Sequence, residues 1–214
     1  MELLHKDLSH DLIGCFFHVH NTLGVGFDEK TYHNALEYHL GKCGINHFSR
    51  ERKALYHRGY QVRSFETDFV ISGKIILELK AIQSRFIQAN YVQILSELKL
   101  WKMQLGLLVN FGLQKVIIER IPFSEKPKTI YENYDHIKDN IDENDRKILA
   151  AVRDSILYVF EVHGLGYGGA LYRKLIETEL EFKKLNYQKK IPISVKYEGE
   201  VISEFKMKPM AVEN

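Results

Sequence analysis

The chain has 214 residues, enough for one large domain or a domain with a smaller companion, and is 45% hydrophobic and 27% charged, as in ordinary globular proteins. No apolar run reaches the length of a bilayer span, and no basic start precedes an apolar signal core, so we expect a cytoplasmic protein without a membrane partner. A formal net charge of +2 excludes a surface that is basic throughout, so any nucleic-acid binding must be local.

Hydrophobic periodicity predicts an α/β or α+β layout with a mixed central sheet. Gly24 and Gly26 should end the first helix and turn the chain into the second. The short turn Ser72-Gly73 makes the strands on its two sides a hairpin. The expected elements are helices at 8–23, 27–40 and 85–104, and strands at 47–56, 60–71, 74–82, 105–111 and 115–121.

The beginning of the chain returns near its end. The segment HVHNTLGVGFDEKTYHNALEYHL (18–40) is echoed by EVHGLGYGGALYRKLIETEL (161–180), with three fewer residues between the His and the Tyr. Residues 122–146 are polar, contain two prolines and show weak periodicity, which is typical of a linker. We therefore expect a first domain at 1–122, a linker at 123–146 and a degenerate, truncated second copy at 147–214.

Two charges interrupt the apolar strand KIILELKAI (74–82), namely Glu78 and Lys80, which point to the same face of the strand. A turn at 72–73 pairs residues whose numbers sum to about 145, which brings Asp68 opposite Glu78. The resulting pattern, D-x9-E-x-K, collects two carboxylates and a lysine, and hard divalent cations prefer such oxygen ligands. A structural ion cluster would produce the same pattern, so the spacing alone leaves both interpretations open.

Two further polar residues fall near this pattern. Glu29 lies on the helical stripe of Tyr32 and Leu36, so it should face inward, where an acid needs a partner. Gln93 lies on the helix after the E-x-K strand and could reach back to the carboxylates. The alternatives are an acid that interacts with the helix dipole and a plain surface amide.

Other groups that often bind ligands give weaker patterns. Cys15 and Cys43 have no paired metal-ligand spacing and are expected to be reduced thiols. The ten histidines fit no closed ligand set, and His20 and His163 take equivalent places in the two copies, which favours structural roles. The glycine-containing loops at 24–29 and 164–169 lack a dinucleotide or P-loop pattern, so we expect no nucleotide cofactor.

Several separate motifs occur in a recognisable order. Gly26-x-x-Glu29-x-x-Tyr32 is preceded by Val19-His20 and followed by Ala35-Leu36-Glu37. The segments TDFVISGKIILELKAI and LGLLVNFG follow, with the Gln93 helix between them. Over about residues 8–121 the chain resembles the GxxExxY proteins of the PD-(D/E)XK nuclease superfamily.

The resemblance implies an αβββαβ core, with Asp68 on the second strand and Glu78-x-Lys80 on the third. It also implies that Glu29, Asp68 and Glu78 hold Mg²⁺ or Mn²⁺, and that Lys80 assists the hydrolytic water. Gln93 matches the family's helix glutamine and would orient Lys80 or a phosphate.

Some positions depart from the family pattern. Glu97 stands where a Tyr is frequent and Asn90 where a His is common, which affects expected substrate contacts but not the ligand set. In the second copy the counterpart of Glu29 is about Gly169 and that of Asp68 is Lys208 or Pro209, and no E-x-K strand follows. That copy is expected to serve packing, dimer-like contact or substrate positioning.

The leading hypothesis is a metal-dependent nuclease acting on nucleic acid, DNA before RNA. One alternative is a catalytically silent module that binds nucleic acid or protein with a nuclease fold. Another is a scaffold in which the two copies form an internal pseudo-dimer, and a homodimer is also compatible with the sequence.

Overall fold

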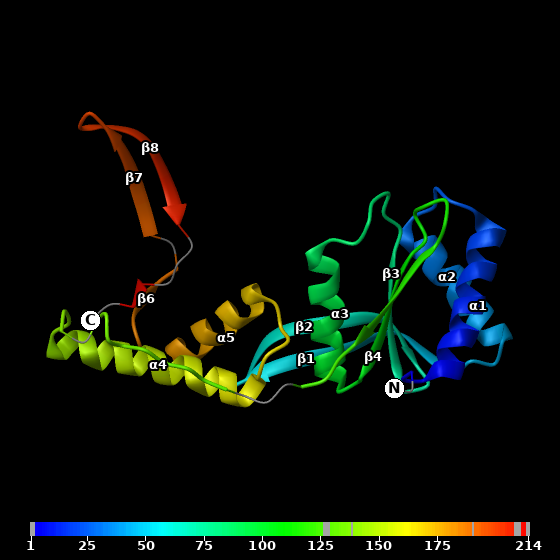
Figure 1. Ribbon diagram of the computed structural model, residues 1–214, viewed down its shortest axis with the longest axis horizontal. Helices are drawn as coiled ribbons and strands as arrows, with labels where there is room; N and C mark the ends of the chain where they lie inside the picture. Colours follow the sequence, from blue (N-terminus) through cyan, green and yellow to red (C-terminus); the bar gives the residue numbers. More distant parts are fainter. Residues whose placement is uncertain (1–2, 126–128, 138, 190, 208–210, 213–214) are drawn as a thin grey trace. The chain divides into compact units, whose positions relative to one another are not determined.

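The computed structural model describes residues 3–125, 129–137, 139–189, 191–207 and 211–212. Contacts along the chain divide it into two units, and Figure 1 shows their helices and strands. The first unit spans Met1–Tyr56, Arg63–Lys126 and Leu165–Leu171, and the second spans His57–Val62, Pro127–Gly164 and Tyr172–Asn214. The segment at 165–171, which comprises a loop and the first residues of the following helix, therefore belongs to the first unit.

Five strands form one sheet, and their order along the sheet is their order in the chain. β2 pairs antiparallel with β3, β3 pairs parallel with β4, and β4 pairs antiparallel with β5. The predicted mixed central sheet is therefore confirmed. The strands are β1 (His47–His57), β2 (Tyr60–Ile71), β3 (Ile75–Lys80), β4 (Leu105–Asn110) and β5 (Ile117–Pro122).

β3 is the middle strand of this sheet, and all of its residues except Lys80 are buried. Leu77 and Leu79 join the apolar cluster on one face, whereas Ile76 joins the cluster on the other. The strand is apolar on both faces because both faces are covered, as in other buried sheets.

α1 (Lys6–Leu23) and α2 (Glu29–Lys42) lie on one side of the sheet, and α3 (Gln88–Trp101) lies on the other (Figure 1). The first two helices bury Phe16, Tyr32 and Leu36 against the sheet. The hydroxyl of Tyr32 donates a 2.7 Å hydrogen bond to the carbonyl of Gly24, which fixes the turn between the helices. Gly24 has a φ of 74°, a conformation that favours glycine.

α3 is three residues shorter at each end than the sequence predicts. Ile87 is extended and serves as the N-cap, and Lys102 takes a left-handed φ of 58° that stops the helix. The loop before α3 is held by buried Asn110, whose amide donates to the carbonyls of Ile82 and Ser84. This buried amide fixes the path of the chain directly after the E-x-K strand.

The second unit contains α4 (Glu143–His163), most of α5 (Gly169–Phe182) and four short strands. β7 (Ile191–Tyr197) and β8 (Glu200–Met207) form an antiparallel hairpin, and β6 (Tyr187–Gln188) pairs with β9 (Ala211–Val212). No helix within the described parts of the chain is long and apolar enough to cross a membrane.

A buried polar cluster lies inside the second unit. Arg58 donates two hydrogen bonds of 2.8 Å to Glu179, and His57 donates a third of 2.9 Å from Nε2. The Nδ1 atom of His57 lies 3.0 Å from Nε2 of His163. Glu179 is fully buried, and the hydrogen bonds from Arg58 and His57 outweigh the effect of burial and lower its pKa.

The helix pairs of the two units share one hydrogen-bonding pattern. Tyr172 donates to the carbonyl of Gly164 eight residues earlier, as Tyr32 does to Gly24. Both glycines end a helix and have positive φ. Each residue of the second pair stands 140 positions after its counterpart.

The hairpin turns repeat the same spacing. Arg58-Gly59 and Glu198-Gly199 are also 140 residues apart, and all four residues have positive φ. This register differs from the one obtained by aligning identical residues of the two segments. The glycine N–H that ends each helix bonds to His20 in the first and to Phe160 in the second, so His20 corresponds to Phe160. The prediction that His20 and His163 occupy equivalent places is therefore wrong. The suggested counterparts of Asp68, Lys208 and Pro209, lie outside the described residues.

Candidate functional site

The site begins where β2 and β3 run side by side. Their register places Phe69 opposite Leu77, so Asp68 falls level with Glu78, as the turn at 72–73 predicted. The backbone N–H of Leu79 donates a 2.7 Å hydrogen bond to Oδ2 of Asp68. Burial raises the pKa of Asp68, although this hydrogen bond and the charge of Lys80 act in the opposite direction.

Glu78 is the acid of β3 and is only 2% exposed. Its Oε1 accepts hydrogen bonds from Nζ of Lys80 and from the amide of Gln93. Its Oε2 is buried and has no hydrogen-bond partner among the described residues. Burial, together with the charges of Glu97 and Asp68, raises the pKa of Glu78 well above its ordinary value.

Lys80 is the cation of the site. Its ammonium contacts Glu78 and lies 3.8 Å from Oε2 of Glu29. Burial disfavours its charge, but the neighbouring carboxylates, Glu78 above all, outweigh that effect and raise its pKa. Lys80 is therefore held as an ammonium between strand β3 and the start of α2.

Glu29 is the first residue of α2, directly after the N-cap Asp28, whose side chain accepts a 2.8 Å hydrogen bond from the backbone N–H of Thr31. The prediction that Glu29 faces inward is wrong, because its side chain is 46% exposed. Tyr32 and Leu36 of α2 pack on the sheet, whereas Glu29, the first residue of the helix, lies at the edge of that packed surface. Glu29 still reaches Lys80, so it lines the rim of the site.

Gln93 lies on α3 and connects two acids. Its amide donates to Oε1 of Glu78 and, over 3.2 Å, to Oε1 of Glu97. The predicted reach of Gln93 back to the E-x-K strand is present in the structure. Its partner is the carboxylate of Glu78, not Lys80.

Glu97 is a site residue that the sequence motifs did not identify. It is 1% exposed, its Oε2 has no hydrogen-bond partner among the described residues, and burial raises its pKa to about 7. The sequence did contain a signal, since Glu97 follows Gln93 by one helical turn and stands between the apolar residues Ile94 and Leu98.

The donor set fits a divalent cation. Four carboxylates, those of Glu29, Asp68, Glu78 and Glu97, lie near the ammonium of Lys80, and two of them bury an oxygen that has no hydrogen-bond partner among the described residues. Hard cations such as Mg²⁺ bind through one or two carboxylates and retain waters. Within the described residues, however, the oxygens of Glu29, Asp68 and Glu78 do not form a group lying wholly within 4.8 Å. The structure thus gathers the donors but does not hold the predicted three-carboxylate set at ligand distance.

A hollow of about 400 Å³ adjoins the site. It is lined by Gln93 and Glu97 of α3, by Arg63 and Glu66 of β2, and by Gly168, Ala170 and Leu171, among others. This hollow lies wholly within the first unit. Gln93, which lines it, contacts Glu78, so the hollow adjoins that acid.

The loop that completes the hollow is anchored on α3. The ammonium of Lys99 donates a 2.5 Å hydrogen bond to the carbonyl of Leu165 and lies 5.3 Å from the ring centre of Tyr167. Gly168 packs so tightly that an added Cβ would lie 2.6 Å from Val92. A segment distant in sequence from the acids is therefore part of their surroundings.

Among known proteins, the chain matches the model of one protein family. The family model of the PD-(D/E)XK nuclease superfamily matches residues 6–121 and 146–214, which is most of the chain. No curated protein matches significantly, and neither does any solved structure. The match agrees with the observed mixed sheet and its flanking helices. The chain belongs to the PD-(D/E)XK nuclease superfamily.

Proposed function

We propose that the chain is a nuclease that hydrolyses phosphodiester bonds of DNA or RNA, DNA before RNA, with Mg²⁺ or Mn²⁺. The observation that carries the proposal is the buried carboxylate of Glu78, which has one oxygen without a partner in the described part of the chain and lies beside Lys80 and level with Asp68. Membership of the superfamily supports the proposal, because PD-(D/E)XK nucleases generally use divalent metals.

Asp68 and Glu78 would hold the cation, with Glu29 approaching from the rim. Glu97 supplies a further buried oxygen close to them. A divalent ion at these carboxylates would lower the pKa of a bound water and offset negative charge on the phosphate. The burial that raises the pKa of the two inner glutamates is the environment in which such compensation has the largest effect.

Lys80 would act on the reacting groups directly. In hydrolysis the water oxygen forms a bond to phosphorus, one bridging P–O bond breaks, and the leaving oxygen takes up a proton. The ammonium of Lys80 can orient the water and stabilise the additional negative charge on the non-bridging oxygens. Its contacts with Glu78 and Glu29 hold it in place for that role.

Gln93 would be a positioning residue. Its amide bridges Glu78 and Glu97, so it fixes the orientation of the Glu78 carboxylate relative to Asp68. Groups that orient metal ligands typically change metal affinity or activity by about 10–100-fold when removed.

We also infer that the chain is a member of the GxxExxY proteins and that residues 147–214 are a degenerate second copy. The constant spacing of 140 residues between Gly24 and Gly164 and between Tyr32 and Tyr172 supports the duplication. Glu29 corresponds to Gly169 in this register, so the second copy lacks that acid. Its contribution to the first unit is the segment at 165–171.

The test is cleavage of labelled DNA and RNA, single- and double-stranded, with Mg²⁺ or Mn²⁺ and with EDTA. Wild type is compared with Asp68→Asn and Lys80→Ala, each first checked by circular dichroism for an unchanged fold. We expect cleavage that requires metal and is lost in both variants. Equal activity in all three proteins would indicate a contaminant and would remove the support for this site.

A catalytically silent binding module is the competing function. It predicts that wild type binds nucleic acid without cleaving it under any of these conditions. The proposal favours catalysis because this chain retains all of Glu29, Asp68, Glu78 and Lys80.

A further inference from the structure

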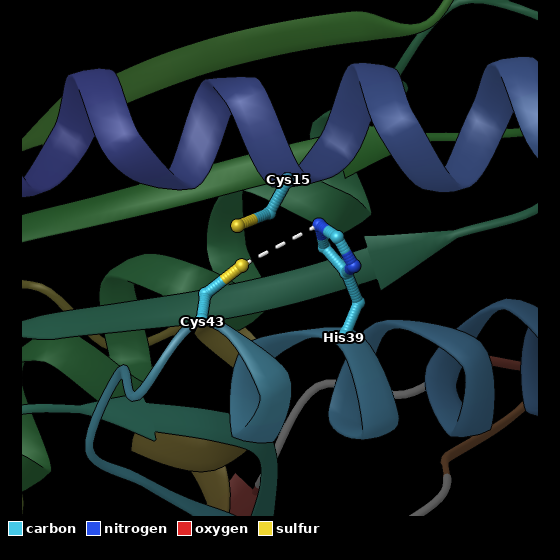
Figure 2. A group of neighbouring side chains, drawn as sticks. All are labelled: Cys15, His39 and Cys43. Atoms are coloured by element: carbon cyan, nitrogen blue, oxygen red, sulfur yellow. Dashed lines mark hydrogen bonds between the residues drawn. The ribbon is translucent and has the colours of Figure 1, made fainter.

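Three soft donor atoms meet between the first two helices, away from the nuclease site. Cys15 comes from α1, His39 from the last turn of α2, and Cys43 directly follows α2 (Figure 2). One ligand atom of each lies within 4.8 Å of the others. The two cysteines show no ligand spacing in the sequence, because Cys15 lies on a different helix from the one that Cys43 follows.

The local geometry directs these atoms toward one point. His39 and Cys43 are one helical turn apart, and Sγ of Cys43 lies 3.6 Å from Nε2 of His39. The ring of His39 stacks on that of His18, with centroids 4.1 Å apart and an interplanar angle of 11°. Cys15 is only 4% exposed and points from α1 toward the other two side chains (Figure 2).

We propose that Cys15, His39 and Cys43 form a Zn²⁺ site that joins α1 to α2, with Asp11 or a water as the fourth ligand. Two thiolates and an imidazole suit Zn²⁺, whereas Mg²⁺ prefers oxygen donors. Zn–S bonds of about 2.3 Å and Zn–N bonds of about 2.0 Å separate tetrahedral ligand atoms by roughly 3.6 Å. The observed distance between Cys43 and His39 meets this requirement.

The site is accessible from solvent and has room for a fourth ligand. A hollow of about 380 Å³ is lined by His10, Asp11, Cys15, His39 and Cys43, among others. Asp11 precedes Cys15 by one helical turn and so lies on the same face of α1. A carboxylate is an ordinary zinc ligand, and a water is equally compatible with three protein ligands.

The role of this site would be structural. α2 carries Glu29 at its first residue and Cys43 just past its last, so the zinc site and the nuclease site lie at opposite ends of one helix. Because a structural metal binds the folded arrangement and not the dispersed ligands, its binding free energy stabilises the fold. The inference does not depend on nuclease activity.

The first experiment measures zinc directly. Reduced protein is stripped with a chelator, given one equivalent of Zn²⁺, dialysed and analysed for metal by mass spectrometry. The Asp68→Asn background is used in parallel, so that metal at the nuclease acids does not contribute. We expect one zinc per chain in both proteins and an upward shift of the unfolding midpoint on zinc addition.

Variants identify the ligands. Cys43→Ser is suitable because Cys43 is exposed, so the change leaves no cavity. Cys43→Ser and His39→Gln should each lower zinc retention at least about tenfold. The control is His136→Gln, which replaces an exposed histidine in the other unit and should retain zinc fully. Asp11→Asn decides between the two fourth ligands, since only a ligating carboxylate would make that change weaken binding.

Cobalt provides a spectroscopic readout. Co²⁺ in place of zinc should show thiolate-to-metal charge transfer and the absorption of tetrahedral cobalt, both absent from Cys43→Ser. Zinc retained equally by Cys43→Ser and His39→Gln would overturn the proposal. So would a Cys15–Cys43 disulfide in protein prepared without reductant, if the reduced form bound no zinc.

Discussion

The carboxylate of Asp68 accepts a 2.7 Å hydrogen bond from the backbone N–H of Leu79, the residue between Glu78 and Lys80. This contact ties the acid of one strand to the backbone of the next. It therefore holds Asp68 level with Glu78 without using the second carboxylate oxygen, which stays available for a ligand. The acids of the D…E-x-K pattern are thus arranged by the backbone as well as by strand register.

Replacing Asp68 should remove activity without unfolding the protein. Asp68→Asn keeps the size of the side chain but loses the negative charge that a divalent ion requires. We expect a loss of at least about 100-fold in the initial rate of cleavage, more than is typical for residues that only orient ligands. Mg²⁺ should raise the thermal midpoint of wild type but not of the variant, and an equal rise in both would place the metal elsewhere.

Gln93→Ala tests positioning, because the amide of Gln93 donates to the carboxylates of Glu78 and Glu97. We expect kcat to fall by about 10–100-fold and the Mn²⁺ concentration for half-maximal rate to rise, with KM for nucleic acid little changed. The matched control is Gln88→Ala, an exposed glutamine on the same helix. A change in KM alone would indicate that Gln93 binds substrate instead.

Glu97→Gln should stabilise the metal-free protein. Within the described residues, Glu97 buries a carboxylate oxygen without a partner close to Glu78, and replacing a buried charge by a neutral isostere removes both desolvation and repulsion. In EDTA we expect the free energy of unfolding to rise by about 1 kcal/mol or more, measured by urea denaturation. The gain should shrink in Mg²⁺, and a loss of stability in EDTA would show that the carboxylate is satisfied by other groups.

Glu179→Ala should weaken the second unit. It leaves Arg58 and His57 without the acceptor that binds both, and breaking a buried ion pair typically costs about 3–5 kcal/mol. Hydrogen exchange of peptides from α4 and α5 should report this loss locally. Glu181 is an exposed acid on the same helix. Glu181→Ala should therefore change the free energy of opening, as reported by hydrogen exchange, by less than about 1 kcal/mol.

The same cluster predicts a dependence of stability on pH. Burial lowers the pKa of His57 below its ordinary value of 6.5, despite the hydrogen bond to Glu179. The unfolded chain therefore binds a proton at a higher pH than the folded one, so the stabilising contribution is complete above about 6.5 and is lost as the pH falls. The pKa of Glu179 is also lowered from its ordinary value of 4.5. Its contribution to stability is therefore lost as the pH falls below about 4.5, in the same direction as that of His57.

The measurement is the urea midpoint between pH 7.5 and pH 5.5, for wild type and His57→Gln. The charged and titratable neighbours of His57 are Glu179, Arg58, His163 and Tyr158. We expect the midpoint of wild type to fall more steeply than that of the variant, because only wild type can take up this proton. Parallel slopes would assign the dependence to other histidines.

Much of the first unit followed from local patterns. The Ile and Leu content of β3 is typical of a strand buried on both faces, and the Ser72-Gly73 turn set its register with β2. Strand pairing across a tight turn is a short-range property, so residue spacing alone suffices to place Asp68 beside Glu78. Errors at helix ends, as at Ile87 and Lys102, reflect backbone conformations that hydrophobic periodicity does not report.

The groupings that the sequence did not reveal are those between elements that are not joined by short turns. Glu97 lies near Glu78 because α3 packs on β3. Cys15 lies near His39 and Cys43 because α1 packs against α2. The sequence alone shows which residues are acidic and which of them lie level on neighbouring strands. Which side chains meet across helix interfaces depends on the packing of whole surfaces, because no spacing along the chain encodes those distances.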